Sequence, residues 1–191
     1  MTNPSLVLAK ASPILAAALT LAAVTQAQTM QSDWQAKWAG ARAYTLAVAD
    51  AMPDSLYGFR PEGLAPRRAL DADALKPAMT FGEQLLHLAD NIRWLSASKL
   101  ADGPRPPRAE VDPRDADAVR AYVDAAFGEG VSALARLTFA DLDEEVDWFT
   151  GERLTRRRVG LLLFDHVTHH RAQAIVYLRL NGIAAPRYVG W

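Results

Sequence analysis

The segment from Thr155 to Leu180 constrains the fold most, because almost nothing in it can interrupt a helix. It contains no proline and a single glycine, Gly160, and it is rich in leucine, valine and arginine. It therefore predicts one long helix. The chain has four histidines, and three of them lie here, at His166, His169 and His170. On a helix, His166 and His170 are about 40° apart and one turn from each other. Their face also carries Val159, Leu162, Leu163, Gln173 and Tyr177.

This face should point into the protein, with two imidazoles in the middle of an apolar surface. His169 is rotated by roughly 80° from the midpoint of the pair and should lie at the edge of the face. Two neutral imidazoles one turn apart can bind one metal ion. The alternative is a pair of core histidines whose ring nitrogens are satisfied by hydrogen bonds. The spacing on an apolar face favours the metal.

Three further helical periodicities precede this segment, and proline-rich breaks separate them. The four predicted helices span residues 33–52, 80–101, 114–137 and 155–181. Ser32 is the expected N-cap of the first, and Thr80 with Glu83 forms a capping box at the start of the second. Strand patterns are weak, and we expect the acidic segment 139–149 to be a short helix or a loop. The prediction is an all-α fold, an up-down four-helix bundle.

The fourth histidine, His87, lies on the second predicted helix but outside its apolar stripe. It shares a flank of that helix with Glu83, Asn91 and Trp94. A histidine on such a flank can point across a bundle toward another helix, or it can lie on the surface. The residues alone leave both interpretations open.

Composition excludes several kinds of function. The chain has no cysteine, which rules out a thiolate nucleophile, a disulfide framework and a thiolate metal site. The formal net charge is −1, and this gives no indication of a nucleic-acid partner or of binding to an acidic membrane surface. The length and the hydrophobic content of 50% suit one domain of ordinary size with its own core.

Residues 1–27 have the pattern of a secretory signal peptide. Lys10 precedes an apolar run from Pro13 to Val24, and small residues around Ala27 suit cleavage after that residue. The run is short for a membrane span. The alternatives are an uncleaved anchor and a misplaced start codon. We expect a signal peptide at 1–27, a helical domain at 28–191, and a periplasmic or secreted protein without a stable membrane span after cleavage.

Three segments resemble the DinB-like (YfiT-type) family. The run from His166 to Gly182 is similar to the last helix of that family, with its His-x-x-His-His-Arg-x-Gln element. Tyr57 to Pro61 resembles the motif after the first helix, and Phe81 to Asp90 the helix that supplies the first ligand. Ala172 stands where glycine is usual in the family. The resemblance covers most of the chain after residue 33.

The resemblance implies a four-helix bundle with a three-histidine metal site. Carried over residue by residue, the ligands are His87, His166 and His170. Three ligands leave at least one open position, and histidine nitrogen suits a divalent ion such as zinc, nickel or iron. Candidates for orienting the imidazoles are Glu83, Asp165 and Gln173. Because imidazole binds metal only when neutral, affinity should fall below about pH 6.5.

Family members resemble thiol transferases and a thiol-dependent isomerase. The resemblance therefore implies a metal-dependent enzyme acting on a small molecule, either thiol transferase-like or a hydrolase. The alternative is a non-catalytic bundle that binds metal or a small ligand. Tyr57, Phe59 and Arg60 could line the mouth of a pocket, or Phe59 could plug the bundle end while Arg60 pairs with a carboxylate. We expect no nucleic-acid partner and leave homodimer formation open.

Overall fold

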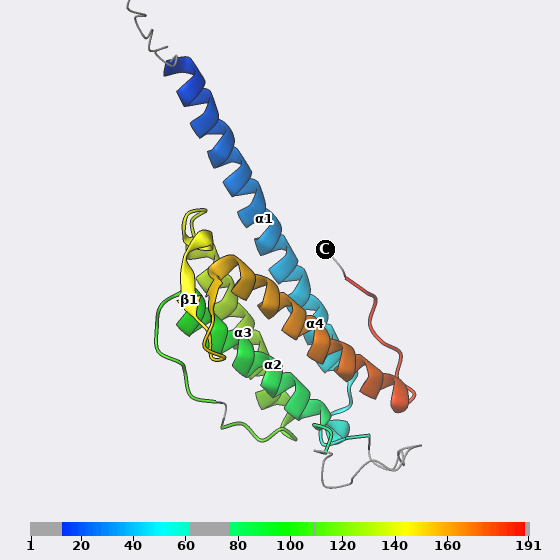
Figure 1. Cartoon of the computed structure of the whole chain (residues 1–191). Coiled ribbons are helices and arrows are strands. Elements are labelled where there is room, and N and C mark those ends of the chain that lie inside the picture. Colours follow the sequence, from blue (N-terminus) through cyan, green and yellow to red (C-terminus); the bar gives the residue numbers. More distant parts are fainter. Residues whose placement is uncertain (1–12, 62–76, 109, 190–191) are drawn as a thin grey trace, which may run out of the picture.

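The computed structural model is mostly helical. It describes residues 13–61, 77–108 and 110–189, with side chains from residue 32 onward. The long helices are α1 (Pro13–Ala51), α2 (Phe81–Leu95), α3 (Ala116–Arg136) and α4 (Arg156–Leu180). A π-helical turn, Ser96–Leu100, continues α2, and 3-10 turns span Asp54–Leu56 and Asp141–Asp143. Two short strands, β1 (Glu145–Asp147) and β2 (Arg153–Thr155), pair antiparallel. Figure 1 shows the elements along the chain.

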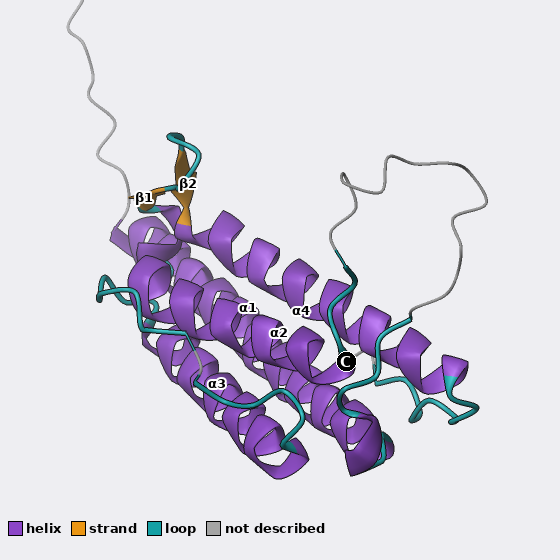
Figure 2. Cartoon of the chain, turned by 90° about the horizontal axis from the view of Figure 1, so that it is seen from below, coloured by secondary structure: helices purple, strands orange, loops and turns teal. Residues whose placement is uncertain are grey.

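The four helices pack into a bundle in which α1 contacts α3 and α4, and α2 contacts the same two helices. Figure 2 shows the helices side by side with the hairpin at one end. Side-chain contacts give the directions of α2 and α3. Asp90 of α2 accepts a hydrogen bond from Tyr122 of α3 at 2.8 Å, and Arg93 of α2 pairs with Glu129 of α3 at 3.1 Å. Residue numbers therefore increase in the same direction along both helices. These two helices are therefore parallel.

The up-down order predicted from the sequence is wrong at this connection. A helix of about 20 residues is about 30 Å long at 1.5 Å per residue. The linker between α2 and α3 carries Pro104, Pro106, Pro107 and Pro113, which favour extended backbone. At roughly 3.3 Å per residue it can return along the whole length of α2. The chain in Figure 1 takes that course, so α3 starts at the same end as α2.

The first helix begins earlier than predicted. It runs unbroken from Pro13, and Ser32 lies inside it instead of capping it. The physical reason is that residues 14–31 contain neither proline nor glycine and are rich in alanine and leucine. The predicted signal peptide and its cleavage after Ala27 lie outside the described side chains. None of the described helical segments combines the length and apolar character that a bilayer span needs.

The other three helices each begin at a residue whose side chain caps the first turn, and for α2 this is the predicted Thr80. The Thr80 hydroxyl accepts from the Glu83 N–H at 3.2 Å, and the Glu83 carboxylate accepts from the Thr80 N–H at 2.6 Å, which confirms the capping box. Asp115 caps α3 and Thr155 caps α4 through side-chain oxygens. The predicted helix starts at 80, 114 and 155 are therefore correct to within two residues.

Two tryptophans of α1 form the packing contact with α3 and α4. Trp38 is fully buried, and its indole N–H donates to the Phe127 carbonyl at 3.1 Å. A side chain at Gly130 would meet the Trp38 ring at 2.6 Å, and one at Gly160 would meet the Trp34 ring at 2.7 Å. These two helical glycines allow the indoles to approach the backbone, which explains their presence inside helices. Trp38 thus belongs fully to the core, while Trp34 is half-buried.

The acidic segment before α4 forms the hairpin, which the sequence did not predict. β1 pairs with β2 in the register Glu145 to Thr155. Arg156 fixes the base of the hairpin. It is buried, and it pairs with Asp102 at 2.5 Å and with Glu144 at 3.1 Å. Arg156 and Arg157 at the start of α4 thus pair with carboxylates of the acidic run. At the other terminus, Tyr188 contacts Tyr44 with a ring separation of 5.8 Å, so the tail returns to α1.

Candidate metal centre

The antiparallel contact between α2 and α4 brings three histidines together. His87 of α2 faces His166 and His170 of α4, with ring centroids 5.0 Å and 4.6 Å away. The rings of His166 and His170 are 4.4 Å apart. Each of the three offers one nitrogen, and these nitrogens all lie within 4.8 Å of one another. The structure therefore places the three predicted ligands at one point.

His169 does not belong to this group. Its side chain is exposed, and its Nε2 lies 2.7 Å from the amide nitrogen of Gln173. The rotation of about 80° derived from helix geometry accounts for this position. Among the described residues, the cluster with metal-ligand geometry contains the other three histidines.

The nitrogen positions are compatible with a shared metal ion. Nε2 of His166 lies 3.2 Å from Nε2 of His87. With metal–nitrogen bonds of 2.0–2.1 Å in a tetrahedral site, two ligating nitrogens lie about 3.4 Å apart. The other ring nitrogen of His166, Nδ1, is buried without a hydrogen-bond partner.

Gln84 orients His170. Its Oε1 lies 2.6 Å from Nδ1 of His170, so Nδ1 carries the proton and donates, which leaves the lone pair on Nε2. The Gln84 amide nitrogen donates to Oε1 of Gln173 at 2.7 Å, which fixes which way the amide points. Gln84 is buried. A histidine that binds a metal through one ring nitrogen commonly donates the N–H of the other to such an acceptor.

Gln84 was not among the residues predicted from the sequence, although its position three residues before His87 on one helix could have indicated it. Of the three orienting candidates, Gln173 takes part only through Gln84. Glu83 instead closes the capping box and pairs with Arg60 at 3.4 Å. Asp165 lines a hollow beside His166.

The comparisons with known proteins decide the family. The family model described as the DinB superfamily matches residues 37–174. The chain belongs to the DinB superfamily. The resemblance found in three short segments is thereby confirmed over most of the chain.

Solved structures of DinB-like proteins share this fold. One from Bacillus cereus is 22% identical with a TM-score of 0.58, covering 81% of this chain and 95% of that one. One from Bacillus subtilis is 20% identical with a TM-score of 0.64, covering 83% and 97%. No curated protein matches the chain. At these identities the structural likeness establishes the fold of this DinB-superfamily member.

Burial keeps the three imidazoles of this DinB-superfamily protein neutral. It lowers the pKa of His166 to about 4, and the neighbouring His87 adds to the effect. It lowers the pKa of His170 to about 3, with a further contribution from His166. The pKa of His87 is also lowered, by burial and then by Arg108, while Asp90 opposes the shift. At neutral pH all three rings therefore present lone pairs, the form that binds metal.

The centre is bordered by three hollows. His87 lines one of about 490 Å³, which also includes Arg60 and Met79, and one of about 110 Å³ under the α2–α3 linker. His166 lines a third of about 360 Å³. Leu162 was predicted to face inward but is 41% exposed, because it lines this third hollow.

Tyr57, Phe59 and Arg60 were expected either to line the mouth of a pocket or to close the bundle end, and the structure supports a different interpretation for each. Tyr57 is fully buried, and its hydroxyl donates to the Ala49 carbonyl at 2.9 Å, so it lines no mouth. Phe59 packs edge-on against Tyr177 at the bundle end. Arg60 pairs with Glu83 and also lines the largest hollow.

Proposed function

We propose that the protein is an exported, metal-dependent enzyme that acts on a small molecule, with one divalent ion held by His87, His166 and His170. The observation that carries the proposal is the convergence of three neutral imidazoles from two helices beside hollows of small-molecule size. Zinc, nickel and iron all suit imidazole ligands. When bound, such an ion lowers the pKa of water or of a thiol and polarises a carbonyl.

A donor set of three supports catalysis over a structural role. Structural metal sites are usually closed by four protein ligands, whereas catalytic sites keep a position for water or substrate. The described residues supply three ligating side chains. His87 and His166 both border hollows, so a small molecule has a route to the fourth position.

Asp90 is our candidate for the group that accepts a proton from the nucleophile. It lies one turn after His87 on α2 and lines both hollows that His87 lines. Its Oδ1 accepts from the Tyr122 hydroxyl at 2.8 Å, and Arg93 donates to the same hydroxyl at 2.6 Å. These contacts hold the carboxylate in place. A general base needs this proximity to the reacting groups.

Two chemistries fit this arrangement. Transfer of a small thiol is what the family resemblance implies, and hydrolysis uses water in the same position. A non-catalytic binding bundle remains the alternative, and a sealed pocket would have favoured it. His87 and Asp90 both line a hollow of about 490 Å³, and this favours the enzyme.

Metal analysis of the purified chain, followed by a screen of esters with and without small thiols, tests the proposal. We expect about one divalent ion per chain and activity that is lost on chelation and restored by the metal. Asp90→Asn should keep the metal and lower kcat by roughly 10²- to 10⁴-fold. If Asp165→Asn loses activity while Asp90→Asn retains it, the assignment of the base is wrong. Full metal loading without activity in the screen would favour the binding bundle.

Export rests on the sequence pattern at the amino terminus. We propose cleavage after Ala27 and a periplasmic or secreted location. Mass spectrometry of the protein recovered from outside the cytoplasm should find Gln28 as the first residue. Recovery of a chain that still begins at Met1 or Thr2 would contradict this.

A further inference from the structure

The three hollows are neighbours along the side of α2 that carries His87. The middle hollow shares His87, Asp90 and Arg108 with the largest one, and it shares Asn91 and Trp94 with the third. Neighbouring hollows therefore have common walls. His87 lines two of these hollows and His166 lines the third, so all three border the candidate metal centre.

The third hollow is an aromatic groove, formed by Trp94, Trp148, Phe149 and Leu162 beside His166. The rings of Trp94 and Trp148 are stacked, with centroids 6.2 Å apart and planes at 16°. The Phe149 ring lies 4.8 Å from Trp148 and 5.7 Å from Trp94. Phe149 is nevertheless 67% exposed.

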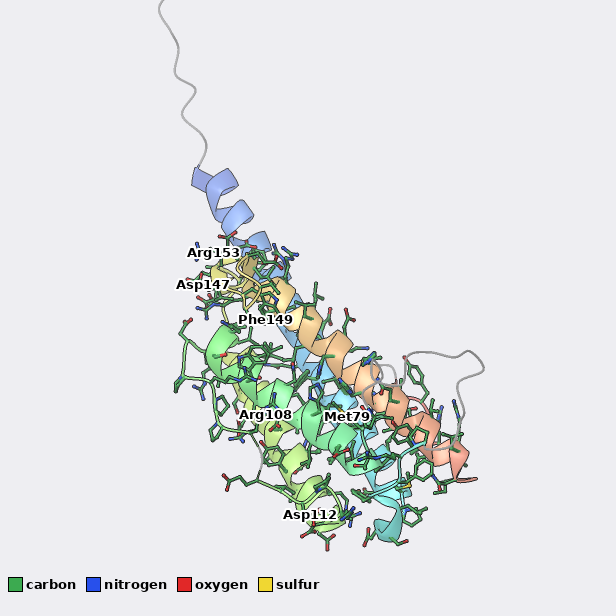
Figure 3. The ribbon with its side chains drawn as sticks, turned by 60° about the horizontal axis from the view of Figure 1, so that its bottom comes forward. Met79, Arg108, Asp112, Asp147, Phe149 and Arg153 are labelled. Atoms are coloured by element: carbon green, nitrogen blue, oxygen red, sulfur yellow. The ribbon has the colours of Figure 1, made fainter. Side chains whose placement is uncertain are left out.

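The aromatic rings are held in position by the hairpin. Trp148 and Phe149 lie in its turn, where the Trp148 N–H donates to the Glu152 carbonyl at 2.8 Å. Lys99 of the π-helical turn donates to the Asp147 carbonyl at 2.6 Å, which ties the hairpin to the end of α2. Figure 3 shows Phe149 beside α4, at the end of the bundle where the hairpin lies.

The size and lining of the groove suit a small ligand. Two of its apolar side chains, Phe149 and Leu162, are exposed, and a ligand in the groove would cover them. The groove holds about 360 Å³, within the size range of small-molecule sites. One of its walls is His166, so an occupant of the groove lies next to the candidate metal centre. Aromatic side chains prefer stacked or edge-to-face partners.

We propose that the aromatic groove binds an aromatic ring of the substrate while the reacting group of that substrate lies at the three histidines. That the occupant is a substrate rests on the proposed function. The binding of the ring itself requires only the groove. The substrate class is therefore a small aromatic compound with a metal-reachable polar group, such as an aryl ester or amide.

Two hydroxamates that differ only in the ring test the inference. Calorimetry on the zinc-loaded protein compares benzohydroxamate with acetohydroxamate, since both carry the same metal-binding group. We expect benzohydroxamate to bind roughly tenfold more tightly. Phe149→Ala should remove most of that difference. Phe139→Ala is the matched control, because Phe139 is also exposed, at 48%, but does not line the groove.

A second titration separates this inference from the proposed function. The metal-free protein is titrated with 2-naphthol, and binding is followed by tryptophan fluorescence. We expect Phe149→Ala to weaken binding roughly fivefold relative to the parent and to Phe139→Ala. The result of this titration does not depend on whether the protein binds a metal or catalyses a reaction.

Equal binding of 2-naphthol by the parent and by Phe149→Ala would overturn the inference. So would equal affinity of the two hydroxamates for the parent. A third outcome also overturns it: Phe149→Ala converts a dimer into a monomer on size-exclusion chromatography without altering ligand binding. The groove would then be a contact between two copies of the chain.

Discussion

Oε1 of Gln84 lies 2.6 Å from Nδ1 of His170, so a side chain of α2 sets the tautomer of an imidazole on α4. Gln84→Leu keeps a side chain of similar bulk but removes the acceptor. We expect metal affinity to fall about 10- to 100-fold, because His170 loses the contact that keeps Nε2 unprotonated. Competition with a chromogenic chelator measures this.

Gln173→Ala serves as the comparison for Gln84→Leu. Gln173 contacts Gln84 and not His170 itself, so its loss should have a smaller effect on metal affinity. Equal affinity of Gln84→Leu and the parent would show that the contact with His170 does not matter for metal binding.

The four histidines give a direct test of the ligand set. His87→Ala, His166→Ala and His170→Ala should each reduce affinity by more than about 100-fold, since loss of a ligand should exceed the loss of a supporting contact. His169→Ala should retain the metal, because this ring is exposed and bonded to Gln173. Metal analysis after purification without chelator checks this. Retention by His170→Ala with loss in His169→Ala would reverse the assignment.

The pKa shifts predict how acid acts on the metal-free protein. The folded pKa values are about 4 for His166 and about 3 for His170, against about 6.5 in an unfolded chain. Between these values the unfolded state binds more protons, so the free energy of unfolding falls as pH drops from about 6.5 toward 4. Urea denaturation of the chelated protein across this range measures the slope.

His166→Gln identifies the part of that slope that comes from the cluster. Carboxylates also titrate in acid, but this variant removes only one histidine, whose pKa is lowered in the folded state. The plot of the free energy of unfolding against pH should therefore be flatter above pH 4. An unchanged slope would contradict the pKa of about 4 for His166. Proton competition for the folded site should likewise begin well below the pH of 6.5 expected from the sequence, because burial lowers the pKa of all three rings.

Local patterns in the sequence predicted the elements that depend on near neighbours. The capping residue Thr80, the helix phase of His166 and His170, and the outward position of His169 all follow from spacing on a single helix. The meeting of His87 with the other two depends on how α2 packs against α4. The family resemblance supplied that information, whereas the flank position of His87 alone left two possibilities open.

Features that depend on distant contacts were not predictable in this way. The parallel course of α2 and α3 is set by where the linker runs, and a linker carries no periodicity. The hairpin has strands of only three residues, held by Arg156 and Lys99 from other elements. α3 runs unbroken through Gly128 and Gly130, although glycine disfavours a helix interior.

The two glycines of α3 give a final matched prediction about stability. A methyl group at Gly130 would lie 2.6 Å from the Trp38 ring, which is fully buried and bonded to the Phe127 carbonyl. Gly130→Ala should therefore destabilise the protein by roughly 1–3 kcal/mol through overpacking. Gly128 is two residues away on the same helix, is exposed, and has open space at that position. Gly128→Ala should stabilise by about 0.5–1 kcal/mol, since only the backbone entropy changes. Urea denaturation of both variants measures the difference, and a Gly130→Ala protein as stable as Gly128→Ala would refute the close contact between Trp38 and α3.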